Sequence, residues 1–340
     1  MTDQVPLDTI RPRIQALTLS QIEAIHYSSL DILARTGIVM KSATGREWLL
    51  DAGARESGER IQIPEHLITD AIASAPSRIP MHDRLGDLVM PLEGDNVYFG
   101  SGSDCIFTHD VETGRRRRAV AEDVQRIAQL CDALDGIDFV MSMGTPSDVP
   151  TMDHYLHSFV KMVQGSRKPL LYTARDRSDM EDIHTIACAI AGGEERLQER
   201  PFLLHYAEPI SPLLFNDESV GKLLFCAEKG LPVTYVPSPN TGGGGPITLA
   251  GAIALGNAEC LVGLLLAQLV RRGTPFLYGL NTAALDMKTA IVSYGSPEWS
   301  LGMAAGTDLA KGYGLPVWGA AGATDSKVVD AQAGIEASIS

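Results

Sequence analysis

The chain has 340 residues, of which 45% are hydrophobic, and its formal net charge is −14 at pH 7. This length has room for one large α/β domain or two smaller ones. The strong negative charge argues against nucleic acid and against acidic membrane surfaces as partners, because both carry negative charge themselves.

The N-terminus, "MTDQVPLDTI", has no basic region followed by an apolar one, so the sequence predicts no signal peptide and a cytoplasmic location. Residues 249–270 are apolar enough to span a membrane. However, Asn257, Glu259 and Gln268 lie within them, and insertion would penalise these polar side chains. We therefore expect a buried helix of a large soluble protein.

The sequence predicts no metal site. Its five cysteines are widely spaced without a C-x-x-C pair, which favours buried free thiols over disulfides or zinc ligands. His154 and His157 are three residues apart on an expected helix, but no strong third ligand accompanies them.

Residues 1–95 are expected to form an N-terminal helical extension. The stretch "LSQIEAIHYSSLDILARTG" has helical spacing, with Ser20 as a cap and Gly37 as a stop signal. A second helix is expected in "IPEHLITDAIASAP", with Pro64 near its first turn.

Residues 96–120, "NVYFGSGSDCIFTHDVETGRRRRAV", are typical of a β-hairpin. The basic run Arg115–Arg118 lies beside its Glu-Thr-Gly turn and is either a solvated hairpin or an anion or partner site. The "GSGSD" motif differs from G-x-S-x-G, which disfavours a serine-hydrolase elbow.

From there a helix-then-strand pattern repeats, and the short apolar strands are introduced by Pro or Gly. This pattern indicates parallel βα units and, without a G-x-G-x-x-G motif, favours an α/β fold of the (β/α)8 TIM-like barrel type over a doubly wound sheet. We place the barrel domain at residues 96–340. The expected strands cover residues 138–144, 169–174, 201–208, 232–239, 275–279 and 316–322.

Six strands, or seven with the segment around Val97, are fewer than the eight of a closed barrel. The sequence also stops inside a helix-like run, "DAQAGIEASIS". The expectation is therefore a barrel truncated at its C-terminus, with the last elements missing.

Aromatic side chains recur at the expected strand ends, where barrel enzymes place their chemistry. They either form an aromatic cage for a cation or only reflect the ordinary preference of aromatic residues for strands. Only some of them can face the barrel axis, because side chains alternate along a strand. The candidate substrate-binding rings are Tyr172, Tyr206, Tyr235, Tyr278 and Trp318.

Polar groups follow the same strands. Glu208 is the favoured catalytic carboxylate and His205 the second catalytic candidate, although a loop cap and a core histidine are the alternatives. Asn281 is a further substrate-binding candidate. Asp325 either contacts substrate or caps a helix beginning near Lys327. Asp104 and Asn240 lie in neighbouring loops.

The loop containing Gly242, Gly243, Gly244 and Gly245 fits neither a phosphate loop nor a dinucleotide fingerprint. We expect it at the catalytic face, where glycines let a partner or substrate approach the backbone closely. Simple flexibility is the alternative.

Four motifs together resemble the trimethylamine methyltransferase family, which includes the glycine betaine methyltransferases. The resemblance implies methyl transfer from a methylated amine to the cobalt of a separate corrinoid protein. This chain would then bind no cofactor tightly, would meet a corrinoid protein and a small methylated amine, and could form a homo-oligomer. Glu208 or His205 would protonate a departing tertiary amine. The motifs are "EPISPL" (208–213), "PSPNTGGGGPITLAGAIALGNAE" (237–259), "LAQLVRRGTPFLYG" (266–279) and "GATDSKVVDAQAGIEA" (322–337).

The archaeal trimethylamine branch of that family contains pyrrolysine, in a region that corresponds to "GATDSKVVD". This chain has standard residues throughout, with Lys327 nearby. It therefore resembles the branch without pyrrolysine, which implies a quaternary amine such as a betaine as substrate.

Two other functions stay open on sequence alone. A barrel lyase or hydrolase using Glu208 or His205 would turn over without a corrinoid partner. A non-catalytic module would bind quaternary amines without demethylating them.

Overall fold

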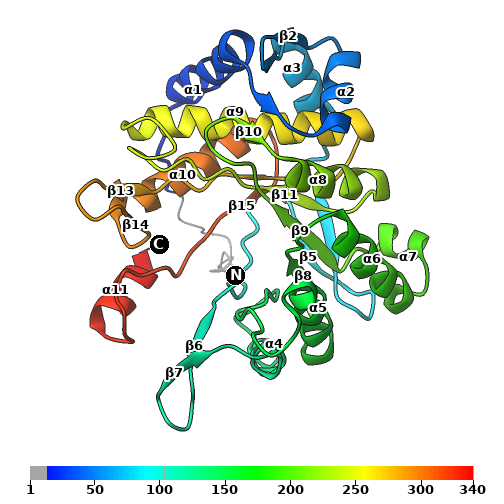
Figure 1. The fold of residues 1–340 in the computed structure, drawn as a ribbon, viewed down its shortest axis with the longest axis vertical. Coiled ribbons are helices and arrows are strands. Elements are labelled where there is room, and N and C mark those ends of the chain that lie inside the picture. Colours follow the sequence, from blue (N-terminus) through cyan, green and yellow to red (C-terminus); the bar gives the residue numbers. More distant parts are fainter. Residues whose placement is uncertain (1–13, 103, 340) are drawn as a thin grey trace, which may run out of the picture.

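The computed structural model describes residues 14–102 and 104–339. Its centre is a five-stranded sheet in the order β15-β12-β11-β9-β8, in which all neighbouring strands are parallel (Figure 1). The strands are short and separated by helices, as the sequence predicts. Their bounds are Leu170–Tyr172 (β8), Leu203–Ala207 (β9), Val233–Tyr235 (β11), Phe276–Gly279 (β12) and Val317–Trp318 (β15).

Two irregular segments continue this sheet beyond β8. Val140 forms a parallel bridge with Leu170, and Gly100 forms one with Phe139. The expected strand at residues 138–144 is thus present only as isolated bridges. Within the described residues, the fold is mixed α/β around a parallel half-barrel sheet. The (β/α)8 TIM-like barrel truncated at its C-terminus, which the sequence leads us to expect, stays a prediction.

Helices cover the outer face of the sheet. The central one is α9, Leu249–Val270, which is capped by the Thr248 side chain and is apolar on all sides because protein surrounds it. It is long and apolar enough to cross a membrane by composition, but 83% of its most apolar window is buried. The other helices after residue 120 are α4 (Ala121–Ala133), η3 (Thr151–Asp153), α5 (His154–Gly165), α6 (Arg177–Ala191), α7 (Glu194–Glu199), α8 (Asp217–Lys229), α10 (Pro297–Gly312) and α11 (Ala331–Ile339).

The N-terminal segment packs onto the outer side of α9. Its first helix, α1 (Leu19–Asp31), is capped by Thr18 rather than by Ser20, because the Thr18 hydroxyl accepts from the Gln21 amide. It continues as a π-helical turn, η2 (Ile32–Thr36), and ends at Gly37, whose φ of 69° favours glycine. The stop signal was thus predicted and the cap was not. Two more helices follow, α2 (Ala43–Asp51) and α3 (Glu65–Ser74).

The sequence predicts a helical extension for this segment, but the structure also contains strands in it. Its hairpin β4–β5 (Ile79–His82 and Leu88–Leu92) carries Met81 and Met90 into a cluster with the inward side chains of the sheet, so it fills the concave side. Apolar alternation on both sides of turn residues is the signal that could have found this hairpin. The remaining short strands are β1 (Val39–Met40), β2 (Arg55–Ser57), β3 (Arg60–Gln62), β10 (Leu214–Phe215), β13 (Ala284–Asp286) and β14 (Ile291–Ser293).

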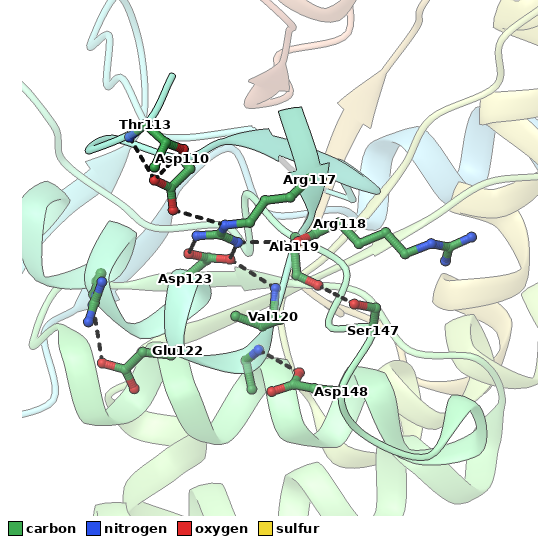
Figure 2. Close-up of polar contacts among 12 residues, drawn as sticks. Asp110, Thr113, Arg117, Arg118, Ala119, Val120, Glu122, Asp123, Ser147 and Asp148 are labelled. Carbon is green, nitrogen blue, oxygen red and sulfur yellow. Dashed lines mark hydrogen bonds and ion pairs between the residues drawn. The ribbon is translucent and has the colours of Figure 1, made fainter. Parts of the chain in front are cut away.

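The predicted hairpin after residue 96 is β6 (Phe107–His109) paired with β7 (Arg116–Arg118). Figure 2 shows why the basic run divides into two parts. Arg117 points inward, where its two terminal nitrogens lie 2.6 and 2.8 Å from the Asp123 carboxylate at the start of α4, and Asp110 also accepts from it. Arg116 points outward and stacks on the Phe107 ring at 3.6 Å.

Candidate active site

The two faces of the sheet separate the predicted aromatic side chains. Tyr206 and Trp318 pack with Leu171 and Leu204 on the concave face. Tyr172, Tyr235 and Tyr278 belong to the core between the sheet and the helices, and each is at most 1% exposed. One cage built from all five rings is therefore excluded, because adjacent strand residues point in opposite directions.

The three outer rings have structural contacts instead. The Tyr235 hydroxyl lies 2.9 Å from the Ser219 hydroxyl, and the Tyr278 hydroxyl donates to Asn257 at 2.9 Å. Tyr172 packs against Phe159 with a centroid distance of 5.7 Å. These rings orient the helices that cover the sheet.

His205 also faces the helices and not the concave side. It is fully buried, with the Tyr172 ring at a centroid distance of 4.9 Å. Burial holds the pKa of His205 well below its usual value, so the imidazole is neutral. Of the two interpretations of His205, the structure favours the core histidine over the catalytic candidate, because positions 205 and 206 point to opposite faces and Tyr206 faces the site.

Glu208, Tyr206 and Trp318 form one cluster at the carboxyl end of the sheet. The Tyr206 hydroxyl donates to the Glu208 carboxylate at 3.0 Å. The Tyr206 and Trp318 rings meet edge to face, with centroids 5.3 Å apart. Tyr206 and Trp318 are half-buried, whereas Glu208 reaches solvent on the open side.

The surrounding protein changes the pKa of these groups. Desolvation raises the pKa of Glu208, while the Tyr206 hydrogen bond and the Lys222 charge partly offset that rise. Desolvation and the Glu208 charge raise the pKa of Tyr206 well above its usual value, so the phenol stays protonated and donates. The carboxyl is therefore more easily protonated than an ordinary glutamate.

Further polar and aromatic groups act on the same space. Desolvation raises the pKa of Tyr155 most, and the Asp104 charge raises it further. The Asp104 charge also contributes to the raised pKa of Glu208 and Tyr206. Tyr294 raises the pKa of Tyr206 as well. Sequence reasoning missed Tyr155 and Tyr294, although each lies in or just after a loop that follows a strand, where candidates are expected.

Lys222 on α8 is the cation whose charge acts on Glu208. Its ammonium donates to the Ala174 carbonyl at 2.8 Å. Burial lowers the pKa of Lys222, and the Glu208 charge opposes that effect. These groups comprise two carboxylates, four rings and one partly buried lysine.

The loop that carries Glu208 is fixed from behind. Ser219 donates to the Glu208 carbonyl at 2.5 Å. Glu259 on α9 is fully buried, and its carboxylate accepts from the Ser211 hydroxyl at 2.7 Å and from the Leu213 amide at 2.6 Å. Burial raises the pKa of Glu259 to about 7. The sequence marked Glu259 only as a polar residue in an apolar helix.

The glycine loop packs against the same segment. The Asn240 carbonyl accepts from the Gly243 and Gly245 amides at 3.0 and 2.9 Å, which closes a tight turn. Gly242 has a φ of 80°, and a Cβ on Gly244 would lie 3.1 Å from the Ser211 carbonyl oxygen. These glycines therefore permit close loop packing, and their approach to a partner stays a prediction.

The last two predicted substrate contacts, Asn281 and Asp325, bind loop residues instead. The Asn281 amide oxygen accepts from the Trp299 indole at 2.7 Å. Asp325 accepts from Ser293 and from the Tyr294 amide, and so supports the β13–β14 hairpin. Asp325 is not a helix cap, because α11 begins at Ala331 and Asp330 accepts from the Ala333 amide.

Within residues 14–102 and 104–339, no group of three His, Cys, Asp or Glu side chains is arranged to hold a metal ion. His154 instead lies 2.6 Å from the Thr151 carbonyl.

A family model described as trimethylamine methyltransferase (MTTB) matches residues 2–340. The chain belongs to this family. It is 32% identical to the glycine betaine methyltransferase of Desulfitobacterium hafniense strain Y51, over 96% of this chain and 68% of that protein. It is 33% identical to the trimethylamine methyltransferase MttB of Desulfitobacterium hafniense strain DSM 10664 / DCB-2, over 93% of this chain and 64% of that protein. The chain thus spans about two thirds of the length of these relatives.

Solved structures support the fold of this family member. The monomethylamine methyltransferase MtmB of Methanosarcina barkeri superposes with a TM-score of 0.50, covering 96% of this chain and 74% of that one. The hydroxylamine complex of MtmB gives the same TM-score. At 10% and 11% sequence identity, these similarities concern the fold alone.

Proposed function

We propose that this protein transfers a methyl group from a methylated amine to a corrinoid carried by a separate protein. Membership of the trimethylamine methyltransferase family supports the reaction class. The structural feature that best supports the proposal is the cluster of Tyr206, Glu208 and Trp318 at the open, carboxyl end of the sheet. Parallel α/β folds bind their substrates at this end.

The cluster fits a quaternary ammonium group. Such a group has no N–H to donate, so selectivity must come from ring faces and from the through-space attraction of carboxylates. Tyr206 and Trp318 supply rings, and Glu208 with Asp104 supplies negative charge. Each ring contributes about 0.5–2 kcal/mol to a desolvated cation.

The reaction asks little acid–base chemistry of this chain. The corrinoid of the partner would supply the methyl acceptor, while this chain's residues bind the amine, orient it and exclude water from it. A quaternary amine departs neutral and needs no proton. A tertiary amine would need one, and Glu208 with its raised pKa is placed to hold it.

We extend the proposal to a betaine-type substrate and a site without pyrrolysine. The support is the similarity to a glycine betaine methyltransferase and the standard residues of the chain, including an exposed Lys327 after β15. Five expectations stay predictions: the truncated TIM-like barrel, the domain boundary near residue 95, the absence of a tightly bound cofactor, the homo-oligomer and the cytoplasmic location.

Calorimetry with a charged and a neutral ligand tests the site. Glycine betaine and 3,3-dimethylbutanoate differ in that a tert-butyl group replaces the trimethylammonium, so shape is kept and the positive charge is removed. We expect the protein to prefer the cation, and Trp318→Leu or Tyr206→Leu to weaken cation binding by a factor of about two to thirty. Equal affinity for both ligands would show that the pocket is merely apolar.

Trp48→Leu is the matched control, since Trp48 lies on α2 of the N-terminal segment and is 38% exposed. The affinity of this variant for glycine betaine should equal that of the wild type.

A turnover assay with and without a corrinoid protein then separates the proposal from the other function classes. Under the proposal, demethylation requires the corrinoid protein. Turnover without a corrinoid protein would indicate a lyase or hydrolase, and binding without any turnover would indicate a binding module.

A further inference from the structure

The buried carboxylate of Glu259 has both of its oxygens directed at one loop. One oxygen accepts from the Leu213 amide at 2.6 Å, and the other accepts from the Ser211 hydroxyl at 2.7 Å. Glu259 lies in the middle of the apolar helix α9 and has no exposed surface. A carboxyl group in such surroundings costs free energy unless its hydrogen bonds repay the cost. The two loop contacts are therefore its compensation.

The loop itself has a backbone that needs support. Leu213 has a φ of 57°, a left-handed conformation that is unfavourable for a residue with a side chain. Such conformations persist where the surroundings enforce them, and they concentrate at functional sites. The Glu259 bond to the Leu213 amide acts directly at this residue.

The same loop begins at Glu208, and two further contacts limit the movement of the loop. Ser219 binds the Glu208 carbonyl and in turn contacts the Tyr235 hydroxyl. Gly244 packs on the Ser211 carbonyl so closely that a methyl group would lie 3.1 Å from the oxygen. The loop of residues 208–213 is thus held at its first residue, at its centre and at its end.

We propose that Glu259 is a positioning residue, which holds the loop of residues 208–213 so that the Glu208 carboxylate meets the Tyr206 hydroxyl at the site. It touches no substrate and acts through Glu208. The part of this proposal that concerns amine binding rests on the proposed function, whereas the part that concerns the placement of Glu208 does not.

The competing explanation is that Glu259 only stabilises the fold. The chain offers a matched control in Gln268, another buried polar residue of α9. Gln268 donates to the Thr274 carbonyl and accepts from the Gly273 amide, so it holds the loop that precedes β12 at the opposite end of the strands. Both residues support a loop, but only Glu259 supports the one with Glu208.

The first experiment follows the Glu208 carboxyl without any ligand. Carbon-13 NMR of glutamate-labelled protein gives its titration, and the resonance is assigned by its loss in Glu208→Gln. Glu259→Leu removes both acceptors, so Glu208 should move toward water and its titration midpoint should fall toward that of an ordinary glutamate. Glu259→Gln, which keeps an acceptor for Leu213 and an amide for Ser211, should restore most of the wild-type midpoint.

Gln268→Leu should lower the melting temperature and leave the Glu208 midpoint unchanged. An unchanged midpoint in folded Glu259→Leu would overturn the proposal. Should Glu259→Leu fail to fold, Ser211→Ala replaces it, because this change removes one of the two bonds and leaves the other. It should move the midpoint in the same direction by a smaller amount.

The second experiment is a double-mutant cycle with glycine betaine as the probe. Glu259→Leu and Glu208→Gln should each weaken binding about tenfold, and the double variant should bind no more weakly than Glu208→Gln alone. Additive losses would show that Glu259 acts independently of Glu208 and would overturn the proposal. If the wild type binds no glycine betaine, the proposed function fails, and the NMR titration still decides the role of Glu259.

Discussion

At the scale of single residues, Glu208 and Glu259 both have a raised pKa for the same reason, but their roles differ. Desolvation raises the pKa of both Glu208 and Glu259. Glu208 reaches solvent and receives one hydrogen bond from Tyr206, whereas Glu259 is fully enclosed and receives two from the loop behind the site. The exposed group is available to a cation and the enclosed one is not.

Amine binding should depend on the protonation of Glu208. Because its pKa is raised, the carboxylate is lost at a higher pH than for an ordinary glutamate, and cation binding should weaken as the pH falls through that value. Calorimetry with glycine betaine across this range measures the effect. Glu208→Gln should bind about tenfold more weakly at pH 8 and show no such pH dependence. A wild type whose affinity is flat with pH would contradict the role of Glu208.

Glu259 should make the stability of the fold depend on pH. Its pKa is about 7 in the folded state against an ordinary value of 4.5, so the folded state holds the proton more tightly. This contribution is complete below pH 4.5 and is lost as the pH rises to 7, by at most about 3 kcal/mol. Urea unfolding at several pH values should show the decline in the wild type and not in Glu259→Gln, and parallel curves for the two proteins would argue against it.

At the scale of elements, hairpins and loops after the strands are held by single side chains with specific partners. Arg117 fixes β6–β7 to the start of α4 (Figure 2). Asp325 supports β13–β14. Gly244 lets the glycine loop rest on residue 211.

Loss of the Arg117 anchor should loosen the hairpin locally. Arg117→Met removes the paired bonds to Asp123, whereas Arg116→Met removes an outward side chain stacked on Phe107. Hydrogen exchange of residues 107–118 should accelerate in the first variant and change little in the second, with little change in melting temperature for either. Identical exchange in the two variants would show that Arg117 is no anchor.

The glycine loop should be sensitive at one position more than at its neighbour. A Cβ on Gly244 meets the Ser211 backbone oxygen at 3.1 Å, while one on Gly243 meets the mobile end of Leu285 at the same distance. Gly244→Ala should therefore push the loop of residues 208–213 and weaken glycine betaine binding severalfold, and Gly243→Ala should not. Methyl transfer slowed by Gly243→Val with unchanged amine affinity would instead support a partner contact at this loop.

At the scale of the whole molecule, the N-terminal segment and the half-barrel share one core. Leu33, Leu49 and Ile68 are fully buried in the same cluster as the residues of α9. Ser29 accepts from the buried Asn257 amide at 2.9 Å, and Asn257 accepts from Tyr278 on the sheet. The segment therefore completes the environment of the helix on which Glu259 lies (Figure 1).

Removal of residues 1–95 should prevent folding. Thirteen large apolar side chains of residues 14–95 are buried, and each contributes about 1.5–3 kcal/mol. The loss therefore exceeds the roughly 5–15 kcal/mol that stabilises a typical protein. Circular dichroism and urea unfolding of residues 96–340 would measure the outcome. Cooperative unfolding of that fragment would show that the half-barrel is independent.

Local signals in the sequence determined much of the fold. The apolar run at residues 249–270 predicted a buried helix, and α9 is one. Its formation and its cap at Thr248 depend on neighbours along the chain, which a sequence displays directly. Five of the six expected strands are present because short apolar runs between helices have few other structures open to them. The place of Glu208 after a strand predicted it as a site residue.

The tertiary structure alone decided which side chains meet. Alternation along β9 requires His205 and Tyr206 to face opposite ways, but only the packing of helices on one face shows that Tyr206 is the one directed to the site. The part played by Glu259 depends on a contact between residues 46 and 48 positions apart. No local pattern encodes such a contact, because it arises only when α9 and the loop of residues 208–213 pack together.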